Sequence, residues 1–251
     1  MNSAPNLINE GKYANVKGSD FRVMSLVGIA HFFSHFYIYL LPPLFPFLKT
    51  ALNVSYTELG LLMAVFSGTT GLTQIPFGFL VDRFGAKFIL IAGLAVEGIA
   101  FSCMGFAPGY PFLVALMFLA GAANGVYHPA DYAILSASVS KTRMGRAFSL
   151  HTFGGYAGFA VAGPVIIFLN STIGWSLGLL ICGVAGIGTA FVLMLYSRDL
   201  RHTVQRKDKV IDQKTKTKSS ADSGVKLLLS PPILMCLVFF TLLSLGSTGI
   251  A

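Results

Sequence analysis

The sequence predicts an all-α membrane protein, and this prediction rests on its composition and its long apolar runs. Of the 251 residues, 54% are hydrophobic and only 11% are charged, a balance typical of membrane proteins. About 20 predominantly apolar residues suffice for a helix to cross a bilayer. Seven segments approach or exceed that length, at approximately 22–48, 55–81, 88–106, 111–138, 146–169, 174–196 and 227–251.

The polar segments divide these spans into a six-helix unit and a separate seventh helix. Residues 1–21 form a polar tail without the features of a cleavable signal peptide. Residues 22–196 hold six spans joined by short turns, and residues 197–226 form a basic hydrophilic linker with too few apolar residues to fold. Residues 227–251 supply the seventh span. Glycine, with 27 residues in the chain, is abundant inside the spans and would let helices approach closely.

The basic residues predict the orientation of these helices, because Lys and Arg are enriched in cytoplasmic loops. With the N-terminus in the cytoplasm, every Lys and Arg except Lys49 falls on the cytoplasmic side. The opposite orientation would place all of them except Lys49 outside. We therefore expect an integral protein of the plasma membrane with a cytoplasmic N-terminus.

A faint internal repeat relates the second span to the fifth. Pro76 and Pro164 lie deep in these two spans, and a pair of glycines precedes each proline. Weak symmetry of this kind is expected where a transporter half is built from inverted three-helix repeats. The glycine pairs are Gly68 with Gly71 and Gly155 with Gly158.

The turn between the second and third spans carries the most specific motif. It reads Gly78-Phe79-Leu80-Val81-Asp82-Arg83-Phe84-Gly85-Ala86-Lys87, which fits the pattern Gly-x-Leu-x-Asp-Arg-x-Gly-x-Lys. This pattern resembles the signature loop of the major facilitator superfamily, although that family usually has Arg in place of Ala86 and often a basic residue in place of Phe88. The resemblance implies that the loop latches two transporter halves together on the cytoplasmic side. The latch residues that it implies are Gly78, Asp82, Arg83, Gly85 and Lys87.

The resemblance also implies the architecture. Members of this superfamily have two six-helix halves that rock around a site at the middle of the membrane. The chain accordingly corresponds to the six-transmembrane-helix N-terminal half of a major facilitator fold plus a seventh helix, the first of the second half. We expect the full-length protein to be a monomer.

Several stretches between residues 22 and 196 resemble one branch, the fosmidomycin-resistance-like transporters. The first span reads Gly28-Ile29-Ala30-His31-Phe32-Phe33-Ser34-His35, and its exit is rich in Leu and Pro. The fourth span reads Asn124-Gly125-Val126-Tyr127-His128-Pro129-Ala130, and the fifth contains Gly163-Pro164. The chain departs from the branch at His35, where an Asp is common. It also lacks the Arg that many proton-coupled members carry early in the fourth span.

Ionisable side chains inside the spans are the candidate site, because each is costly in a bilayer unless it is paired or solvated. His31 and His35 are four residues apart and share a helix face, and His128 and Asp131 are three apart and share another. Histidine titrates near neutral pH. A pair formed by His128 and Asp131 could therefore carry a coupling proton or hold an anionic substrate. The alternative is that the two residues only cap helix contacts at the inner gate.

Further polar residues could join this cluster. Asn124 precedes His128 by about one turn, and His151 lies near the cytoplasmic end of the fifth span. Glu97 stands at the midpoint of the third span, which in the superfamily lies mostly behind the cavity. We interpret it either as a buried protonated residue bonded to a neighbour or as a substrate ligand. The hydrogen-bond partners available to the cluster are Tyr37, Gln74 and Tyr127.

Other classes of function find less support. Cys103, Cys182 and Cys236 all fall in apolar spans, so disulfides are not expected and metal-ligand spacing is absent. The net charge of +8 is spread over short loops, so no folded basic face is available for nucleic acid. Neither His-Glu-x-x-His nor Gly-x-Ser-x-Gly occurs, which argues against a membrane-embedded enzyme. We expect no metal and no cofactor.

The function predicted from the sequence is secondary active transport of a small solute by alternating access. The resemblance implies proton-coupled efflux of a drug or antibiotic. Uptake of a small organic anion is the alternative, because a histidine-lined cavity suits such a substrate at least as well. A non-transporting membrane sensor on the same fold is a second alternative. Protons and membrane lipids are the other expected partners, the lipids through the basic linker.

Overall fold

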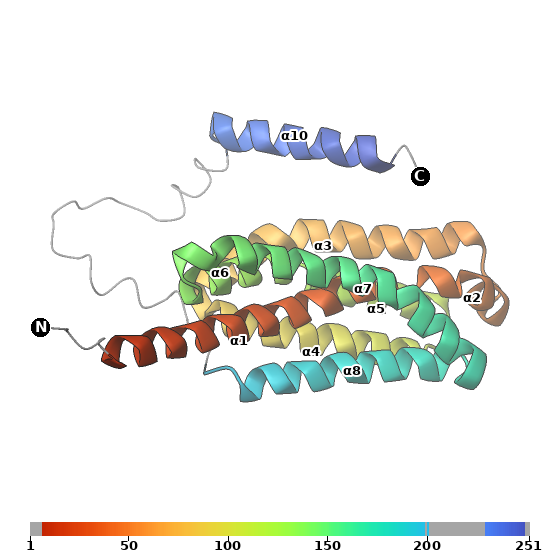
Figure 1. Ribbon diagram of the computed structural model, residues 1–251. Coiled ribbons are helices and arrows are strands. Elements are labelled where there is room, and N and C mark those ends of the chain that lie inside the picture. Colours follow the sequence, from red (N-terminus) through yellow and green to blue (C-terminus); the bar gives the residue numbers. More distant parts are fainter. Residues whose placement is uncertain (1–6, 199, 201–228, 249–251) are drawn as a thin grey trace, which may run out of the picture. The chain divides into compact units, whose positions relative to one another are not determined.

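The computed structural model describes residues 7–198, 200 and 229–248, and nearly all of these are helical (Figure 1). No strand occurs within these ranges. The chain divides into two units, Met1–Arg206 and Lys207–Ala251. The prediction of an all-α protein is confirmed.

The first span is a long helix followed by a short helical segment. α1 runs from Leu7 to Ile38, so the helix extends back through much of the segment expected to be a polar tail. A 3₁₀ turn, η1 (Pro42–Leu44), and the short helix α2 (Phe45–Leu52) complete the span. Proline has no backbone N–H, so the pair at positions 42 and 43 interrupts the α-helical hydrogen bonds. Asn53 ends α2 in the left-handed conformation, with φ of 53°.

The second span is the helix α3 (Tyr56–Phe84), which begins with a capping box. The Ser55 hydroxyl accepts a hydrogen bond from the backbone N–H of Glu58 at 3.2 Å. In return, the Glu58 carboxylate accepts one from the backbone N–H of Ser55 at 2.8 Å. These two bonds satisfy N–H groups that the first turn of a helix leaves unpaired.

A single residue, Gly85, joins α3 to the third span, α4 (Ala86–Met104). Its φ of 92° lies in a region that L side chains rarely adopt, which explains the glycine. The very tight turn expected from the sequence is therefore present. However, α3 continues to Phe84, so Asp82 and Arg83 occupy its last turn rather than a loop.

The fourth span is broken into α5 (Tyr110–Asn124) and α6 (Tyr127–Ser138). Pro129 lies one turn beyond the break, and its missing N–H would have bonded to the carbonyl of Gly125 in a continuous helix. Pro129 thus loosens this helix, and the break falls at the residue whose carbonyl loses its partner. As a result, Asn124 ends one helix and Tyr127 begins the next.

The fifth and sixth spans repeat the joint seen between the second and third. α7 (Met144–Ile173) follows a 3₁₀ turn, η2 (Lys141–Arg143), and α8 (Trp175–Leu195) completes the unit. Gly174 alone joins α7 to α8, with φ of 84°. Its N–H bonds to the carbonyl four residues earlier, as the N–H of Gly85 does. The two joints are equivalent in an inverted repeat of three helices.

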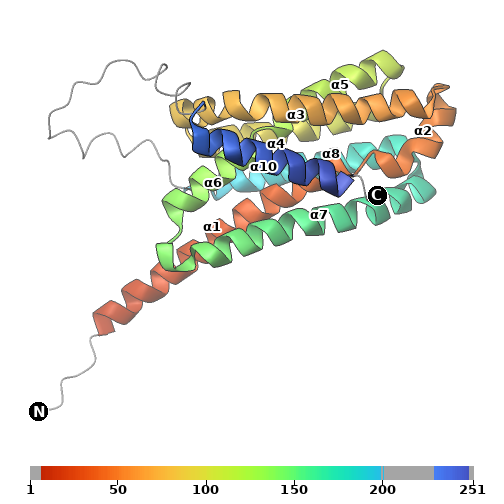
Figure 2. The same cartoon turned by 90° about the horizontal axis from the view of Figure 1, so that it is seen from above.

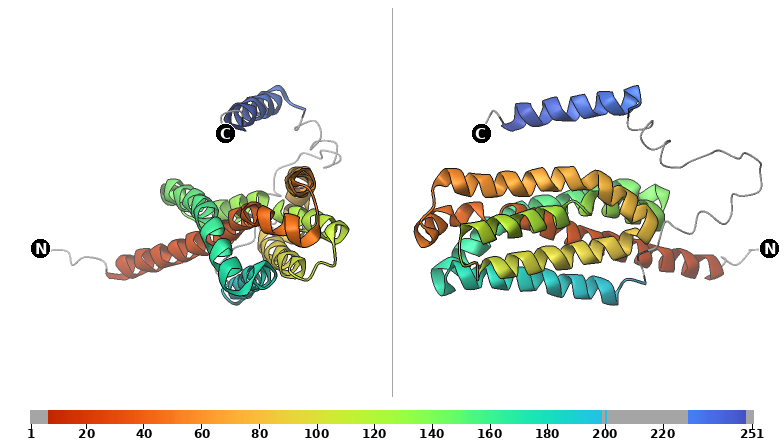
Figure 3. Two further views of the ribbon diagram at one scale, coloured as in Figure 1. Left: turned by 90° about the vertical axis from the view of Figure 1, so that its right-hand side faces the viewer. Right: turned by 180° about the vertical axis from the view of Figure 1, so that it is seen from behind.

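The packing of the helices has the same symmetry. α1 packs along α7, α3 along α5, and α4 along α8 (Figures 2 and 3). A repeat that relates the first three spans to the next three converts the pairing of α1 with α7 into that of α3 with α5. It leaves the pairing of α4 with α8 unchanged. At the crossing of α4 and α8, a Cβ on Gly98 would lie 2.7 Å from the carbonyl oxygen of Gly183. Small residues at this crossing therefore permit the close approach of the two backbones.

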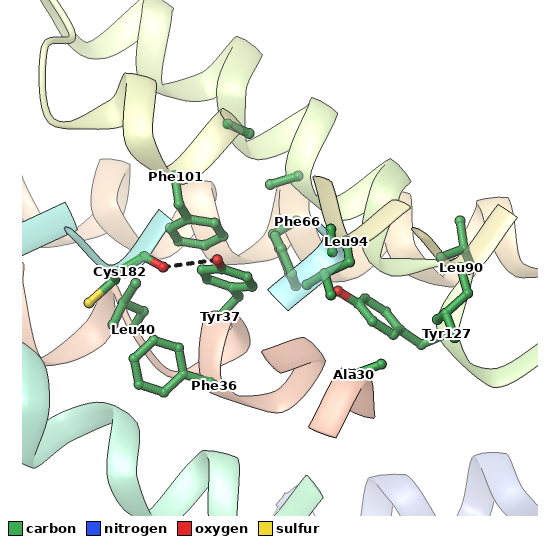
Figure 4. Close-up of a cluster of buried hydrophobic side chains, with 14 of the residues drawn as sticks. Ala30, Phe36, Tyr37, Leu40, Phe66, Leu90, Leu94, Phe101, Tyr127 and Cys182 are labelled. Atoms are coloured by element: carbon green, nitrogen blue, oxygen red, sulfur yellow. Dashed lines mark hydrogen bonds between the residues drawn. The ribbon is translucent and has the colours of Figure 1, made fainter. Parts of the chain in front are cut away.

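Aromatic rings fill the centre of the bundle (Figure 4). The ring of Tyr37 on α1 stacks on that of Phe101 on α4, with centroids 4.5 Å apart. The Tyr37 hydroxyl donates a hydrogen bond to the backbone carbonyl of Cys182 on α8 at 3.0 Å. Both the apolar and the polar parts of this side chain are thereby satisfied inside the core.

Within the described part of the chain, five helical segments are long and apolar enough to cross a membrane, at Asp20–Leu52, Ala86–Met104, Tyr110–Ser138, Lys141–Ile173 and Trp175–Leu195. α3 is not among them, although its 29 residues would reach about 44 Å. Its polar threonines lower its hydropathy, and they bond to backbone carbonyls, as Thr69 does to Val65 at 2.7 Å.

In the second unit, α10 (Pro231–Thr248) lies within the expected seventh span, whose ends at 227–228 and 249–251 are outside the described residues. Almost all of the expected linker, 197–226, also lies outside them.

Candidate functional site

Four histidines and one aspartate meet where three helices of the first unit come together. His31 and His35 lie on α1, His128 and Asp131 on α6, and His151 on α7. The ring centroid of His31 is 4.5 Å from that of His35, 5.2 Å from that of His128 and 3.6 Å from that of His151. Residues that the sequence placed on separate spans thus form one cluster, called here the histidine cluster.

Asp131 is the acidic centre of the histidine cluster. Its side chain has no exposed surface, and those of His31 and His151 are only 3% exposed. Asp131 Oδ2 lies 3.0 Å from His151 Nε2, within a hydrogen bond, and 3.2 Å from His31 Nδ1. The second contact has the distance of an ion pair but not the direction of a hydrogen bond, since His31 Nδ1 has no hydrogen-bond partner.

His31, His151 and Asp131 form a trio, and the geometry of its two rings limits the charge that it can hold. The rings of His31 and His151 are stacked, with an angle of 23° between their planes. Two stacked imidazolium rings would repel each other strongly in a medium of low dielectric constant. The arrangement therefore suits one positive charge shared by the two rings and balanced by Asp131. With that one positive charge the group is neutral overall, which a buried site favours.

His35 and His128 form the less buried side of the cluster. The ring of His35 also packs against Phe159 on α7, at 4.3 Å between centroids. The Nδ1 atoms of His35 and His128 are buried without a hydrogen-bond partner. Gly155 on α7 makes room for α1, because a Cβ there would lie 3.0 Å from both His31 Cδ2 and His35 Cε1.

Glu97 belongs to a second, separate polar cluster. It is fully buried on α4 and accepts hydrogen bonds from Asn124 Nδ2 at 2.9 Å and from the Tyr127 hydroxyl at 2.7 Å. Asn124 also donates to the Ser34 hydroxyl at 3.0 Å. This network agrees with the interpretation of Glu97 as a buried residue bonded to its neighbours. Asn124 therefore donates to Glu97, and no described contact joins Asn124 to the histidines.

Three other expected contacts of the site differ in the structure. His128 and Asp131 were expected to pair, but among the described residues Asp131 pairs with His31 and His151. The Asp131 carboxylate on α6 faces α1 and α7, and this direction depends on how the helices pack. Tyr37 bonds to α8 rather than to a histidine. Gln74 makes no side-chain hydrogen bond to any described residue.

Sequence reasoning missed two residues of these clusters. Ser34 follows His31 by three residues, and Tyr132 follows His128 by four, so helical spacing could have included both. The Tyr132 ring is 5.8 Å from that of His128 and 5.5 Å from that of His151, and 45% of the side chain is exposed. Tyr132 therefore borders the cluster on its open side.

A further polar contact lies near the start of α7. Asp20, counted with the polar tail, is instead 3% exposed and accepts hydrogen bonds from the Ser140 hydroxyl at 2.8 Å and from Arg143 at 3.1 Å. It ties α1 to η2. A cavity of about 450 Å³ adjoins this contact and is separate from the histidines, lined by Phe21, Met24, Arg143, Arg146 and Leu150.

The implied latch residues cluster at the joint of α3 and α4. Asp82 and Arg83 are exposed, and within the described residues Asp82 forms no ion pair. Lys87 is partly buried in the first turn of α4. A Cβ on Gly78 would meet no described atom within 4 Å, so no neighbour among the described residues requires a glycine there.

The first unit is an all-α bundle of membrane-spanning length with the helix pairing of an inverted repeat. A model of the Major Facilitator Superfamily matches residues 27–251, and the chain belongs to that family. It is an integral membrane protein. The family and the transporters named below are consistent with a protein that is not an enzyme.

Two relatives and one solved structure illustrate the similarity. The chain is 25% identical over 155 residues to the "Probable sulfoacetate transporter SauU" of Cupriavidus necator. This match covers 61% of the chain and 36% of the relative. It is 24% identical over 155 residues to the "Probable L-galactonate transporter" of Escherichia coli, covering 62% and 34%. The chain thus spans about a third of the length of these relatives.

The solved structure is the crystal structure of a bacterial homolog to the human lysosomal transporter Spinster, in an inward-facing and unoccupied conformation. It matches with a TM-score of 0.67 and 17% identity, covering 81% of this chain and 47% of that one. At this identity the match supports the fold alone.

Proposed function

We propose that the protein is a secondary active transporter of a small organic anion, coupled to protons through the histidine cluster. The observation that carries this proposal is the burial of His31, Asp131 and His151 at the junction of α1, α6 and α7. Ionisable groups inside a membrane are costly and usually mark a substrate or proton pathway.

In this proposal the trio binds the proton, and the two outer histidines, His35 and His128, bind the substrate. His31 and His151 share Asp131, so the trio can hold one coupling proton. His35 and His128 have unpartnered ring nitrogens on the less buried side, next to exposed Tyr132. We infer that these two rings meet the anionic group of the substrate, because an imidazole N–H donates to a carboxylate or sulfonate and a protonated ring also attracts it.

The relatives support an anionic substrate. Sulfoacetate and L-galactonate, named for two of them, are small organic anions. Arg143 and Arg146 line the cavity near the start of α7, and basic groups there would raise the local concentration of an anion. The orientation predicted from the basic residues puts this end of the bundle in the cytoplasm of a plasma-membrane protein.

Alternating access would occur by rocking of two six-helix halves around the midplane site. The first unit supplies one half, and the exposed charges at the joint of α3 and α4 would form the latch with the other. We expect such a transporter to act as a monomer.

Efflux of a drug or antibiotic is the second candidate. It is favoured by the Tyr127-His128-Pro129-Ala130 stretch, which resembles the fosmidomycin-resistance-like branch. The break before α6 that this stretch creates also places His128 in the cluster. Expression in a drug-sensitive host separates the candidates, because only efflux would raise resistance.

Uptake into vesicles tests the proposal. The protein, with any sequence that follows residue 251 in its gene, is reconstituted and offered labelled sulfoacetate or L-galactonate with and without a pH gradient. We expect accumulation to require the gradient. Asp131→Asn should abolish this accumulation but leave exchange of labelled for unlabelled substrate, because it removes the counter-charge of the proton and spares His35 and His128. Equal uptake with and without the gradient would refute the coupling, and binding without flux would favour the sensor.

A further inference from the structure

Three imidazoles of the histidine cluster also have the geometry of an uncompleted metal site. His31, His128 and His151 each offer one ring nitrogen, and these three atoms lie within 4.8 Å of one another. In a tetrahedral zinc site the nitrogens lie about 2.0–2.1 Å from the metal and hence about 3.3 Å from one another. Closing the difference requires the three rings to rotate toward a common point.

The unpaired atoms at this place point to a cation. His31 Nδ1, His128 Nδ1 and Asp131 Oδ1 are buried without hydrogen-bond partners, and the side chains of His31 and Asp131 are more than nine-tenths buried. Buried polar atoms in folded proteins are nearly always bonded. A cation bound by the imidazoles would satisfy His128 Nδ1 and balance the charge of Asp131, whose carboxylate lies 3.2 Å from His31 Nδ1.

The chemistry of the donors selects the class of cation. Imidazole nitrogens suit zinc, copper, nickel and iron, whereas calcium and magnesium prefer oxygen ligands. Ligation uses neutral imidazoles, and the stacked rings of His31 and His151 repel each other least when both are uncharged. Histidine ligands usually donate their other N–H to a carboxylate, and Asp131 lies at that position beside both rings.

We propose that His31, His128 and His151 bind a divalent transition-metal ion of the zinc, cobalt and nickel class, and that Asp131 orients the rings. Three histidines leave a fourth position open to water or to an anion. The ion would tie α1, α6 and α7 together. It would also occupy the place of the coupling proton, so metal and proton would compete.

Metal titration of the 251-residue chain tests this proposal without substrate or a membrane gradient, so its outcome is independent of the transport assay. The chain is purified in detergent, its affinity tag is removed, and Zn²⁺ binding is followed by calorimetry. Co²⁺ is used as a spectroscopic probe of tetrahedral ligation. We expect one ion per chain. His128→Asn and His151→Asn should each weaken binding at least tenfold, and Asp131→Asn about 10–100-fold as an orienting residue.

Two further variants make the test specific. His202→Asn changes the fifth histidine, which lies outside the described residues, and it should leave the affinity unchanged. His128→Cys should retain tetrahedral Co²⁺ binding, because a thiolate also ligates these metals. Circular dichroism and gel filtration confirm that each variant is folded. An absence of saturable binding in the wild type, or equal affinity in the wild type and the folded His128→Asn variant, would overturn the proposal.

Discussion

Buried polar residues of the first unit fall into two clusters that obey different rules. In the histidine cluster, several buried atoms lack a hydrogen-bond partner, although Asp131 is shared by two rings. In the Glu97 cluster, both carboxylate oxygens accept a hydrogen bond. A fully satisfied buried network mainly stabilises and specifies a fold. An incompletely satisfied one is a place where a ligand can bind.

A double-mutant cycle on Glu97 and Tyr127 tests this distinction. Glu97→Leu should lower the free energy of unfolding by about 1–3 kcal/mol for each donor left without a partner. Tyr127→Phe removes one of those donors, so the double variant should lose less than the sum of the two single variants. We expect a coupling energy of about 0.5–3 kcal/mol, measured by denaturant unfolding in detergent. Strictly additive losses would show that the two side chains do not interact.

Sharp interruptions of the backbone at glycine and proline determine where the helices of the bundle begin and end. Gly85 and Gly174 turn the chain between consecutive spans in one residue each. Pro129 frees the carbonyl of Gly125, and the break that results places Tyr127 and His128 at the start of a new helix. The Glu97 cluster depends on this break, because Asn124 lies before the break and Tyr127 after it, and both donate a hydrogen bond to Glu97.

The joint between α3 and α4 gives a matched pair of substitutions. Gly85→Ala forces a methyl group into a conformation with φ of 92°, which should cost about 1–3 kcal/mol of stability. Gly78→Ala adds the same group within α3, where nothing lies within 4 Å. Because alanine favours a helix, that variant should be neutral or more stable by about 0.5–1 kcal/mol. Thermal unfolding in detergent distinguishes the two, and equal melting temperatures would contradict the assigned strain.

At the scale of the whole molecule, the first unit has the pairing of an inverted repeat, and two of its surfaces carry exposed polar side chains. The open side of the histidine cluster at Tyr132 is one of these surfaces. The exposed Asp82 and Arg83 at the end of α3 form the other. The second half of a major facilitator would meet both. We therefore assign the latch to conformational change and the cluster to binding.

This assignment predicts the effect of Asp82→Asn in the transporter. A contact made in only one conformation shifts the balance between conformations without touching the substrate. We expect turnover to fall by about tenfold, equivalent to about 1.4 kcal/mol in the barrier, while substrate affinity changes less. Uptake rates and equilibrium binding on the same vesicles measure the two quantities. A variant with wild-type turnover would remove Asp82 from the latch.

Much of the fold could be predicted from the sequence alone. Apolar length and short polar turns determine where membrane helices form, because a bilayer leaves unpaired backbone groups no alternative to internal hydrogen bonds. The spacing of Gly, Asp, Arg and Lys from Gly78 to Lys87 identified the superfamily, and the ionisable residues within spans identified the candidate site. These are local properties of the chain.

Only the tertiary structure decided which residues meet. Helical spacing can place His128 and Asp131 on one face, but it cannot say that Asp131 is turned toward His31 and His151. Nor can it separate Asn124 and Tyr127, which serve Glu97, from the histidines one turn away. Side chains pair across helices according to how the helices cross, and that crossing depends on small residues such as Gly155 that are distant in sequence from the site they accommodate. The sequence by itself determined the spans and the family, and the packing determined the site.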